Sequence, residues 1–303
     1  MSKEITIERS QIQSSHMPQE TSFLVMSDLH YHPHVDKKIY KMILQYVMTI
    51  EPDYIMIPGD VFETDAFLED RKSIQFMTTF FHCLGEISKV IIIPGNHDIT
   101  DYNAKTFVNK NYSGQSGSVK FLASLSRISN VYFLDNEQLD ISHLTFIGLN
   151  PRNETYLKRE DSRINEMFIE DFLREHYHLT KENYNIVLNH NPLPLLDQEI
   201  NVAIPEFAFC DLGVAGHFHN GYMPKMLSSR VEGTDIGIFT VPWISPFPGT
   251  PCRGLHPFGR GHLFVAKAVR MFGADLPLIG LLDNVSAHYM GELVVSPQKV
   301  KTR

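Results

Sequence analysis

The 303-residue sequence has few cysteines, and their arrangement argues against two common scaffolds. The three residues, Cys83, Cys210 and Cys252, are odd in number and widely spaced, and no Cys-x-x-Cys pair occurs. A disulfide framework uses an even set of cysteines, and a zinc ribbon uses paired Cys-x-x-Cys motifs. Neither class fits this chain. The scarcity of cysteine favours a reducing compartment, so we expect a cytoplasmic protein.

The sequence also lacks a long apolar run. Its first stretch, MSKEITIERSQIQSSHMPQE (residues 1–20), is polar and predicts a flexible lead-in rather than a signal peptide. The most apolar late stretch, FGADLPLIGLLD, is interrupted by Asp275 and Pro277 and is too short to span a bilayer. We therefore expect no transmembrane segment. We expect a single domain over residues 21–303, with a C-terminal strand and loop extension after about residue 240.

Positive charge is scarce as well. The chain carries 35 acidic and 27 basic residues, a net charge of −8, and has no long Lys/Arg run. A protein that grips nucleic acid by its phosphates needs a basic surface, so nucleic acid is disfavoured as the main partner. A small phosphorylated substrate fits better, because bound metal can supply the positive charge that the side chains lack.

Short apolar runs alternate with stretches of helical periodicity in the first third of the chain. Over residues 36–52, apolar residues recur in steps of three and one, which marks one face of a helix with Asp36 as its predicted N-cap. A second helix is predicted over residues 70–87, and apolar strands precede, separate and follow the two helices. This order is typical of a parallel sheet. With the strands predicted after residue 130, it favours one α/β domain with two sheets.

Four further segments are predicted that contain no candidate metal ligands. Helices are expected over residues 119–128 and 162–177, and a polar glycine-rich loop over 99–118 is of the kind that often covers a site. A proline- and aromatic-rich loop spans residues 241–260, and its Phe258 either lines a substrate pocket or packs in the core.

Five of the predicted strands end in side chains that can bind metal. In open α/β sheets the loops at the carboxyl ends of the strands converge on one crevice, so residues far apart in sequence can meet there. Within Asp-x-His and His-x-His, residues two apart on a strand point the same way. The five motifs are SDLH with Asp28 and His30, PGD with Asp60, PGNHD with Asn96, His97 and Asp98, NHNP with His190, and GHFH with His217 and His219.

Each motif alone has an ordinary structural explanation. Asp28 and Asp60 are common turn residues, and His190 fits a buried, hydrogen-bonded histidine. The occurrence of five such strand ends in one chain is much harder to explain by turns. We therefore interpret them together, as one metal-binding cluster.

In this order the five motifs resemble the calcineurin-like metallophosphoesterases, over about residues 21–220. The resemblance implies a four-layer α/β/β/α sandwich with a two-metal centre at its edge. It also implies His97 as the catalytic histidine, with Asp98 orienting the ring of His97. The implied ligands are Asp28, His30, Asp60 and His219 for one metal, and Asp60, Asn96, His190 and His217 for the other.

The sequence departs from the family pattern at one position near the bridging aspartate. Relatives often carry a second aspartate three residues later, where this chain has Glu63, and the role of Glu63 stays open. The stretch ETDAF stands where the protein phosphatases carry Asp-Arg-Gly, which argues against a Ser/Thr protein phosphatase. The GDVF and GNHD pieces resemble the nuclease branch, whereas HNP and GHFHNG resemble small bacterial phosphoesterases.

The chemistry explains why such a cluster would be assembled. Two divalent ions roughly 3.5–4 Å apart neutralise phosphoryl oxygens and generate a bridging hydroxide that attacks in line. Asp60 suits a bridge because a carboxylate has two oxygens, and His97 would assist the leaving oxygen. Nitrogen and oxygen ligands without thiolate suit Mn, Fe, Zn, Co or Ni.

The sequence thus predicts a dinuclear metal-dependent phosphoesterase acting on a monoester or a diester. Two alternatives stay open: a scaffold that keeps the fold and has lost turnover, and a nuclease of the same family. The sequence does not determine the substrate, the metal or the oligomeric state.

Overall fold

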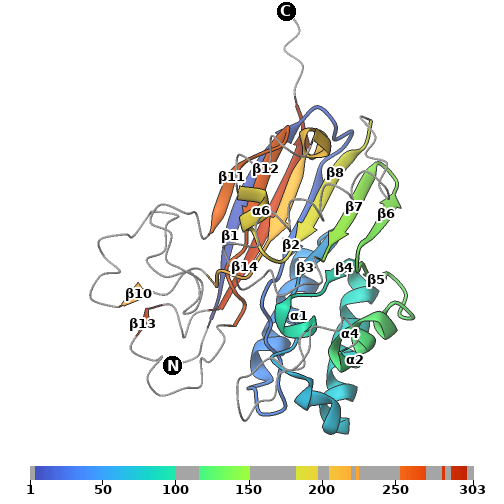
Figure 1. The fold of residues 1–303 in the computed structure, drawn as a ribbon, viewed down its shortest axis with the longest axis vertical. Helices are drawn as coiled ribbons and strands as arrows, with labels where there is room; N and C mark the ends of the chain where they lie inside the picture. Colours follow the sequence, from blue (N-terminus) through green and yellow to red (C-terminus); the bar gives the residue numbers. More distant parts are fainter. Residues whose placement is uncertain are drawn as a thin grey trace, which may run out of the picture.

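Two six-stranded sheets form the centre of the fold (Figure 1). A separate two-stranded sheet pairs β10 (Met223–Pro224) with β13 (Leu282–Asp283). The computed structural model describes residues 4–99, 116–150, 182–196, 205–219, 223–224, 253–270, 282–283 and 288–298.

The first sheet is mixed and has the strand order β1-β14-β2-β3-β4-β5. Strands β2 to β5 run parallel, β14 runs antiparallel to β2, and β1 runs parallel to β14 at the edge. The strands are β1 (Ile5–Ser14), β2 (Thr21–Val25), β3 (Tyr54–Pro58), β4 (Lys89–Ile93), β5 (Val131–Phe133) and β14 (His288–Pro297).

The second sheet has the order β11-β12-β9-β8-β7-β6. Its four inner strands run parallel, and the strands at its two edges run antiparallel to their neighbours. The strands are β6 (Glu137–Ile141), β7 (Leu144–Leu149), β8 (Tyr184–Asn189), β9 (Leu212–Ala215), β11 (Gly254–Phe258) and β12 (Gly261–Val265).

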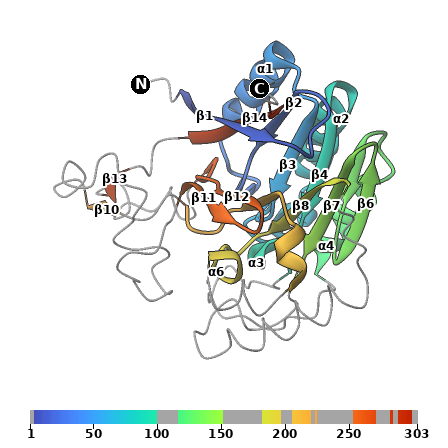
Figure 2. The same cartoon turned by 90° about the horizontal axis from the view of Figure 1, so that it is seen from above.

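Helices pack on the outer faces of both sheets. Helices α1, α2 and α4 share an apolar cluster with the outer face of the first sheet, and Figure 2 shows α1 and α2 on that side. Two shorter helices, α6 and η4, contribute to a cluster on the far face of the second sheet. The helices are α1 (Lys38–Ile50), η1 (Asp65–Glu69), α2 (Arg71–Ile87), α3 (Asn96–Ile99), α4 (Gly117–Leu125), α6 (Leu193–Leu196) and η4 (Pro205–Phe209).

The core between the sheets is built from buried apolar side chains. Phe23 and Met56 of the first sheet pack there with Phe146 and Leu188 of the second. Large side chains on two facing sheets bury far more apolar surface than either sheet could bury alone, and this burial is the main force that holds the layers together. The arrangement confirms the predicted α/β fold with two packed sheets and agrees with an α/β/β/α sandwich.

The helix ends differ slightly from the sequence predictions. The N-cap of α1 is Lys37, while the predicted cap Asp36 accepts the N–H of Lys38 at 3.0 Å. Helix α4 begins two residues before the predicted start, because the hydroxyl of Ser116 accepts the N–H of Val119 and caps the helix at that point.

The prediction of a flexible lead-in was wrong for residues 5–14. These residues form β1, which pairs along its full length with β14. Ile5 and Ile7 alternate with polar residues and pack against the outer cluster, and Ile12 is buried between the sheets. The alternation is weak on its own. Residues 5–14 form a strand because they pair with β14, which comes from the opposite end of the chain. A local sequence pattern does not reveal such a distant partner.

Some predicted segments lie outside the described residues. They are the helix over residues 162–177, most of the glycine-rich loop over 99–118, and residues 241–252 of the aromatic loop. The end of that loop forms β11, where Phe258 packs against Phe207 with ring centroids 5.1 Å apart. Phe258 is therefore a core residue and does not line a pocket.

The sheet topology brings the five motifs to one edge of the fold. Strands β2, β3 and β4 are parallel neighbours in the first sheet, as are β8 and β9 in the second. Each motif follows the carboxyl end of one of these strands. Since the carboxyl ends of parallel neighbours meet at the same edge, the polar side chains that follow them are collected in one place.

The docking of β1 can be tested by mutation. Replacing Ile12 with alanine should lower the free energy of unfolding by about 2–5 kcal/mol, because it leaves a cavity in the core between the sheets. The exposed neighbour Gln13 serves as the control, and alanine there should change stability by no more than about 0.5 kcal/mol. Urea unfolding of both variants measures the difference. Equal stability of the two variants would mean that β1 is not docked.

Candidate metal centre

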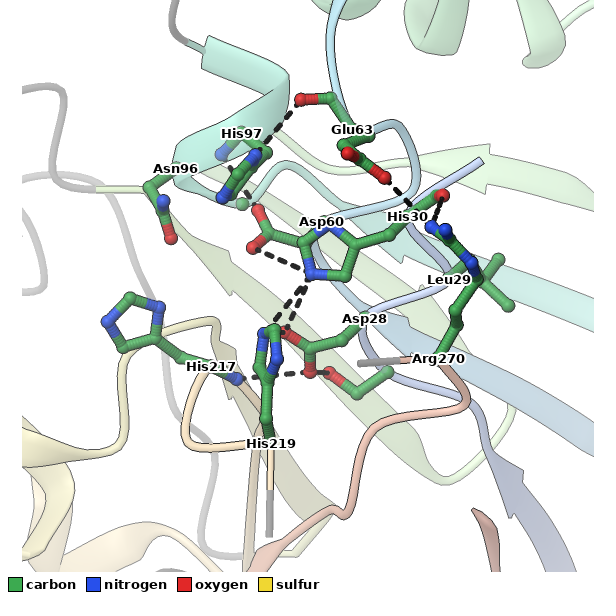
Figure 3. A network of polar contacts seen from close by, with 12 residues as sticks. Asp28, Leu29, His30, Asp60, Glu63, Asn96, His97, His217, His219 and Arg270 are labelled. Carbon is green, nitrogen blue, oxygen red and sulfur yellow. Dashed lines mark hydrogen bonds and ion pairs between the residues drawn. The ribbon is translucent and has the colours of Figure 1, made fainter. Parts of the chain in front are cut away.

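The seven predicted ligand side chains converge in a buried cluster. Figure 3 labels all of them except His190. Two groups share Asp60, and within each group one ligand atom per residue lies within 4.8 Å of the others. The first group is Asp28, His30, Asp60 and His219, and the second is Asp60, His190 and His217. Asn96 joins the second group through its Oδ1 atom, which lies 3.1 Å from Nε2 of His190.

The spacing within the cluster fits metal ligands. Nε2 of His30 lies 3.1 Å from Nε2 of His219, and Nδ1 of His217 lies 3.2 Å from Nε2 of His190. Two ligands of one ion, each at about 2.1 Å, are separated by about 3.0–3.4 Å at octahedral or tetrahedral angles. A chain that points several nitrogen lone pairs and carboxylates at one another, away from water, needs cations between them.

Asp60 presents one oxygen to both groups. Its Oδ1 accepts the backbone N–H of His97 at 2.8 Å. Its Oδ2 lies 3.1 Å from Nε2 of His190 and 3.8 Å from Nε2 of His30. The sequence argument used both oxygens for the bridge, whereas the geometry leaves Oδ2 alone to face the two groups.

The other aspartate is held in a similar way. Oδ2 of Asp28 accepts the hydroxyl of Ser27 at 2.5 Å and the backbone N–H of His217 at 3.1 Å. Among the described residues its Oδ1 has no assigned hydrogen-bond partner, and it lies 3.0 Å from Nε2 of His219. One oxygen is thus fixed by the protein and the other is left for a cation, which suits a single-oxygen ligand.

Hydrogen bonds also select the histidine tautomers. Nδ1 of His190 donates to the carbonyl of Pro58 at 2.7 Å, which leaves Nε2 as the ligating atom. Nδ1 of His97 donates to the carbonyl of Glu63 at 3.0 Å, so its Nε2 is the atom available for chemistry. The ring of His97 packs edge-on against His30 with centroids 4.8 Å apart, which places it beside the first group.

The ligands sit on unusual backbone. Nine described non-glycine residues have positive φ, and five of them are predicted ligands. Left-handed backbone costs an L-residue about 1–2 kcal/mol, so this concentration reflects a demand of the site. The five angles are 55° at Asp28, 42° at His30, 52° at Asp60, 68° at His217 and 53° at His219.

Glycine is required in the PGNHD motif for a steric reason. A Cβ atom on Gly95 would lie 2.2 Å from Oδ1 of Asp60 and 2.3 Å from its backbone nitrogen. The turn after β4 must pass this close to Asp60 so that the N–H of His97 can reach the carboxylate. The glycine therefore allows the two strand ends to share one buried site.

The model of the calcineurin-like phosphoesterase family matches residues 21–221, which is more than half of the chain and contains every predicted ligand. The chain belongs to this family. No curated protein sequence matches the chain significantly.

Solved structures match the chain at low sequence identity and with low TM-scores. One crystal structure is 11% identical with a TM-score of 0.45, covering 82% of this chain and 91% of its own. Pseudomonas putida nuclease MPE is 12% identical with a TM-score of 0.32, over 67% of this chain and 64% of its own. GAP50, the anchor in the inner membrane complex of Plasmodium, is 11% identical with a TM-score of 0.41, over 82% and 71%. These values carry no functional argument.

Asp98 has a different role from the predicted one. The sequence assigned it to orient the ring of His97, as a phosphoesterase catalytic pair. Its carboxylate instead accepts three backbone N–H groups, from Gly95 at 2.9 Å, Phe62 at 3.0 Å and Val61 at 3.2 Å. The ring of His97 is instead held by the backbone carbonyl of Glu63, which accepts a hydrogen bond from its Nδ1. Asp98 therefore fastens the turn after β4 to the turn after β3, because its buried carboxylate accepts N–H groups from both turns.

Charge is balanced within the cluster by its own residues. Burial would raise the pKa of a carboxyl, but His219 beside Asp28 and His190 beside Asp60 hold both pKa values below the usual range. Burial lowers the pKa of an imidazole, yet the Asp60 carboxylate outweighs it and raises the pKa of His190 to about 9. Burial and the nearby His190 lower the pKa of His217 to about 3. In the metal-free protein, a proton on His190 supplies part of the missing positive charge.

Two residues at the site were not found from the sequence. Ser27 is the first residue of SDLH and fixes Asp28, but a serine before an aspartate carries no recognisable signal. Arg270 lies close to His30 and comes from beyond the family match. Another arginine of the same region, Arg260, pairs with Asp211 at 2.7 Å, just before β9 begins.

The raised pKa of His190 predicts how metal binding depends on pH. Because Nε2 must lose its proton to bind a cation, Mn²⁺ binding at neutral pH should release about one proton, and affinity should rise about tenfold per pH unit until the pH approaches 9. Calorimetric titration in buffers of different ionisation enthalpy measures the proton count. Binding without proton release at neutral pH would contradict a protonated His190.

The raised pKa of His190 also determines how the stability of the metal-free protein changes with pH. A raised imidazole pKa contributes stability that is fully present below about pH 6.5 and is lost as the pH rises through about 9.

Proposed function

We propose that the chain is a metal-dependent hydrolase of phosphate esters with two divalent ions. One ion would be held by Asp28, His30, Asp60 and His219, and the other by Asp60, Asn96, His190 and His217. The observation that carries the proposal is the shared oxygen of Asp60, which faces both buried ligand groups while His97 holds its other oxygen. A single metal would need no such shared carboxylate.

The protein groups have separate tasks in the proposed reaction. Two bound divalent ions neutralise phosphoryl oxygens and lower the pKa of the attacking water. Asp60 and Asp28 keep fixed orientations because each has one oxygen tied to a backbone N–H. Nδ1 of His97 donates to the carbonyl of Glu63, so Nε2 is the nitrogen available to the leaving oxygen, and it would donate a proton there from the doubly protonated ring.

The donor atoms narrow the choice of metal. All seven proposed ligands offer nitrogen or oxygen, and none is a thiolate, which suits Mn, Fe, Zn, Co or Ni. The net charge of −8 supports a small phosphorylated substrate over nucleic acid, because the chain lacks the positive charge that a polyanion attracts.

The proposal extends to domain organisation and compartment. A single domain over residues 21–303 is supported by β14, which comes from the far end of the chain and pairs with both β1 and β2. The chain has three widely spaced cysteines and no Cys-x-x-Cys pair, and Cys83 is a free thiol, which supports a reducing compartment such as the cytoplasm. No helix within the described ranges is long and apolar enough to cross a membrane.

Two other functions are weighed against the phosphoesterase. A scaffold without turnover would be expected to lose ligands or His97, whereas all of them are present and brought together. A nuclease of the same family is favoured by the GDVF and GNHD motifs but opposed by the acidic charge balance.

Substitution of the central residues tests the proposed chemistry. His97→Ala should lower turnover of a generic aryl phosphodiester by at least about 100-fold and leave metal content unchanged, because His97 assists the reaction without binding metal. Asp60→Ala and His217→Ala should lose both turnover and metal. His82→Ala is the control, since this histidine lies exposed on α2, 58% accessible. Wild-type turnover in all three site variants, with metal supplied, would refute the centre.

A substrate panel separates the three functions. Monoesters, cyclic nucleotides, linear diesters and lipid pyrophosphates, each with several metals, should reveal hydrolysis of at least one small ester. Full metal occupancy with no turnover of any ester would favour the scaffold. Degradation of nucleic acid that weakens steeply as salt rises would favour the nuclease, because binding to phosphates releases counterions.

A further inference from the structure

Arg270 lies against the metal centre although it comes from outside the family match, which ends at residue 221. It belongs to the segment that follows β12 and runs beside the first motif. The N–H of Val269 donates to the carbonyl of Ser27 at 2.8 Å, and the N–H of Arg270 donates to the carbonyl of Asp28 at 3.0 Å. The segment therefore lies alongside the SDLH motif, and Arg270 is carried into the site by backbone pairing.

The guanidinium of Arg270 is buried and contacts three groups. Nη1 donates to the backbone carbonyl of His30 at 2.7 Å and to Oε2 of Glu63 at 2.8 Å. Nη2 lies 2.9 Å from Nε2 of His32. The arginine side chain is only 5% exposed. One side chain thus joins the turns after β2 and β3 to the segment after β12, as Figure 3 shows for His30, Glu63 and Arg270.

Glu63 extends this connection to the catalytic histidine. Its side chain is held by Arg270, and its backbone carbonyl accepts Nδ1 of His97 at 3.0 Å. Its N–H donates to the carbonyl of Tyr31 at 3.0 Å, so its backbone is fixed on both sides. The position of the His97 ring therefore depends on where Arg270 holds Glu63.

We propose that Arg270 and Glu63 form a clamp that positions His30 and His97 for the reaction without touching the substrate. The inference rests on the proposed function. His30 has left-handed backbone, with φ of 42°, and the guanidinium bond to its carbonyl stabilises that conformation. A buried guanidinium beside a cationic centre also requires a nearby anion, and Glu63 supplies it.

The chain offers a matched control in Arg260. Its guanidinium binds Asp211 through Nε at 2.8 Å and Nη2 at 2.7 Å, and it donates to the carbonyl of Asn183 at 2.9 Å. Like Arg270, Arg260 thus binds a carboxylate and a backbone carbonyl, but it does so where β9 and β12 begin, whereas the metal ligands follow the carboxyl end of β9. Lysine at either position keeps the charge and loses the fork of donors.

The test compares Arg270→Lys, Glu63→Gln, the double variant and Arg260→Lys. Five quantities are measured for each: kcat and KM on bis(4-nitrophenyl) phosphate with saturating Mn²⁺, the Mn²⁺ affinity, the absorption spectrum of the Co²⁺-loaded protein, and urea stability. Arg270→Lys should lower kcat about 10- to 100-fold, the range typical when a residue that orients a metal ligand is removed, with little change in KM. Arg260→Lys should lose stability but keep kcat and the Co²⁺ spectrum.

The double variant tests whether the two residues act as one unit. If they do, Arg270→Lys combined with Glu63→Gln should lower kcat little further than Arg270→Lys alone. Wild-type kcat and metal affinity in Arg270→Lys would overturn the clamp, as would an equal loss of kcat in Arg260→Lys.

Failure of the proposed function is distinguishable from failure of the clamp. If the wild-type protein hydrolyses no ester, the proposed function falls, and Mn²⁺ affinity then decides the clamp. Affinity about tenfold weaker in Arg270→Lys than in Arg260→Lys would support it. Equal affinities would overturn it.

Discussion

The carboxylate of Asp60 is the interaction on which the site depends. It is buried, it lies between two groups of ligands, and its two oxygens are treated differently. The N–H of His97 holds Oδ1, so Oδ2 faces both groups. Neighbouring residues support that orientation of the carboxylate. Gly95 makes room for the turn that carries His97, and Asp98 fastens that turn to the residues after Asp60.

This arrangement requires strained backbone angles at several ligand residues. Five ligands adopt left-handed angles that L-residues avoid, because a strand that simply continued would point them away from the crevice. Hydrogen bonds between the turns hold these angles. The N–H of Asp28 donates to Gly59 and the N–H of His30 donates to Asp60, at 3.2 and 3.0 Å. A core packed on both faces of the sheets provides the rigidity that keeps the turns in register. The turns and the core therefore hold the ligand residues in fixed positions.

The sequence predicted the parts of the fold that depend on local pattern. Periodic apolar residues identified α1 and α2, and apolar runs ending in polar motifs identified β2, β3 and β4. The metal ligands could be predicted as a set, because their residue types are unusual at strand ends. Contacts between distant segments could not be predicted. Strand β1 forms by pairing with β14, which lies at the other end of the chain. The carboxylate of Asp98 accepts backbone N–H groups, although the ring of His97 is next to it in sequence. Arg270 carries no motif and is recognised only by what it touches.

Diffraction at the Mn absorption edge, from crystals grown with Mn²⁺, tests the central claim most directly. The account predicts two anomalous peaks about 3.5–4 Å apart. One should lie among Asp28, His30, Asp60 and His219, and the other among Asp60, Asn96, His190 and His217, with Oδ2 of Asp60 in contact with both. A single peak, or two peaks that do not share Asp60, would contradict it.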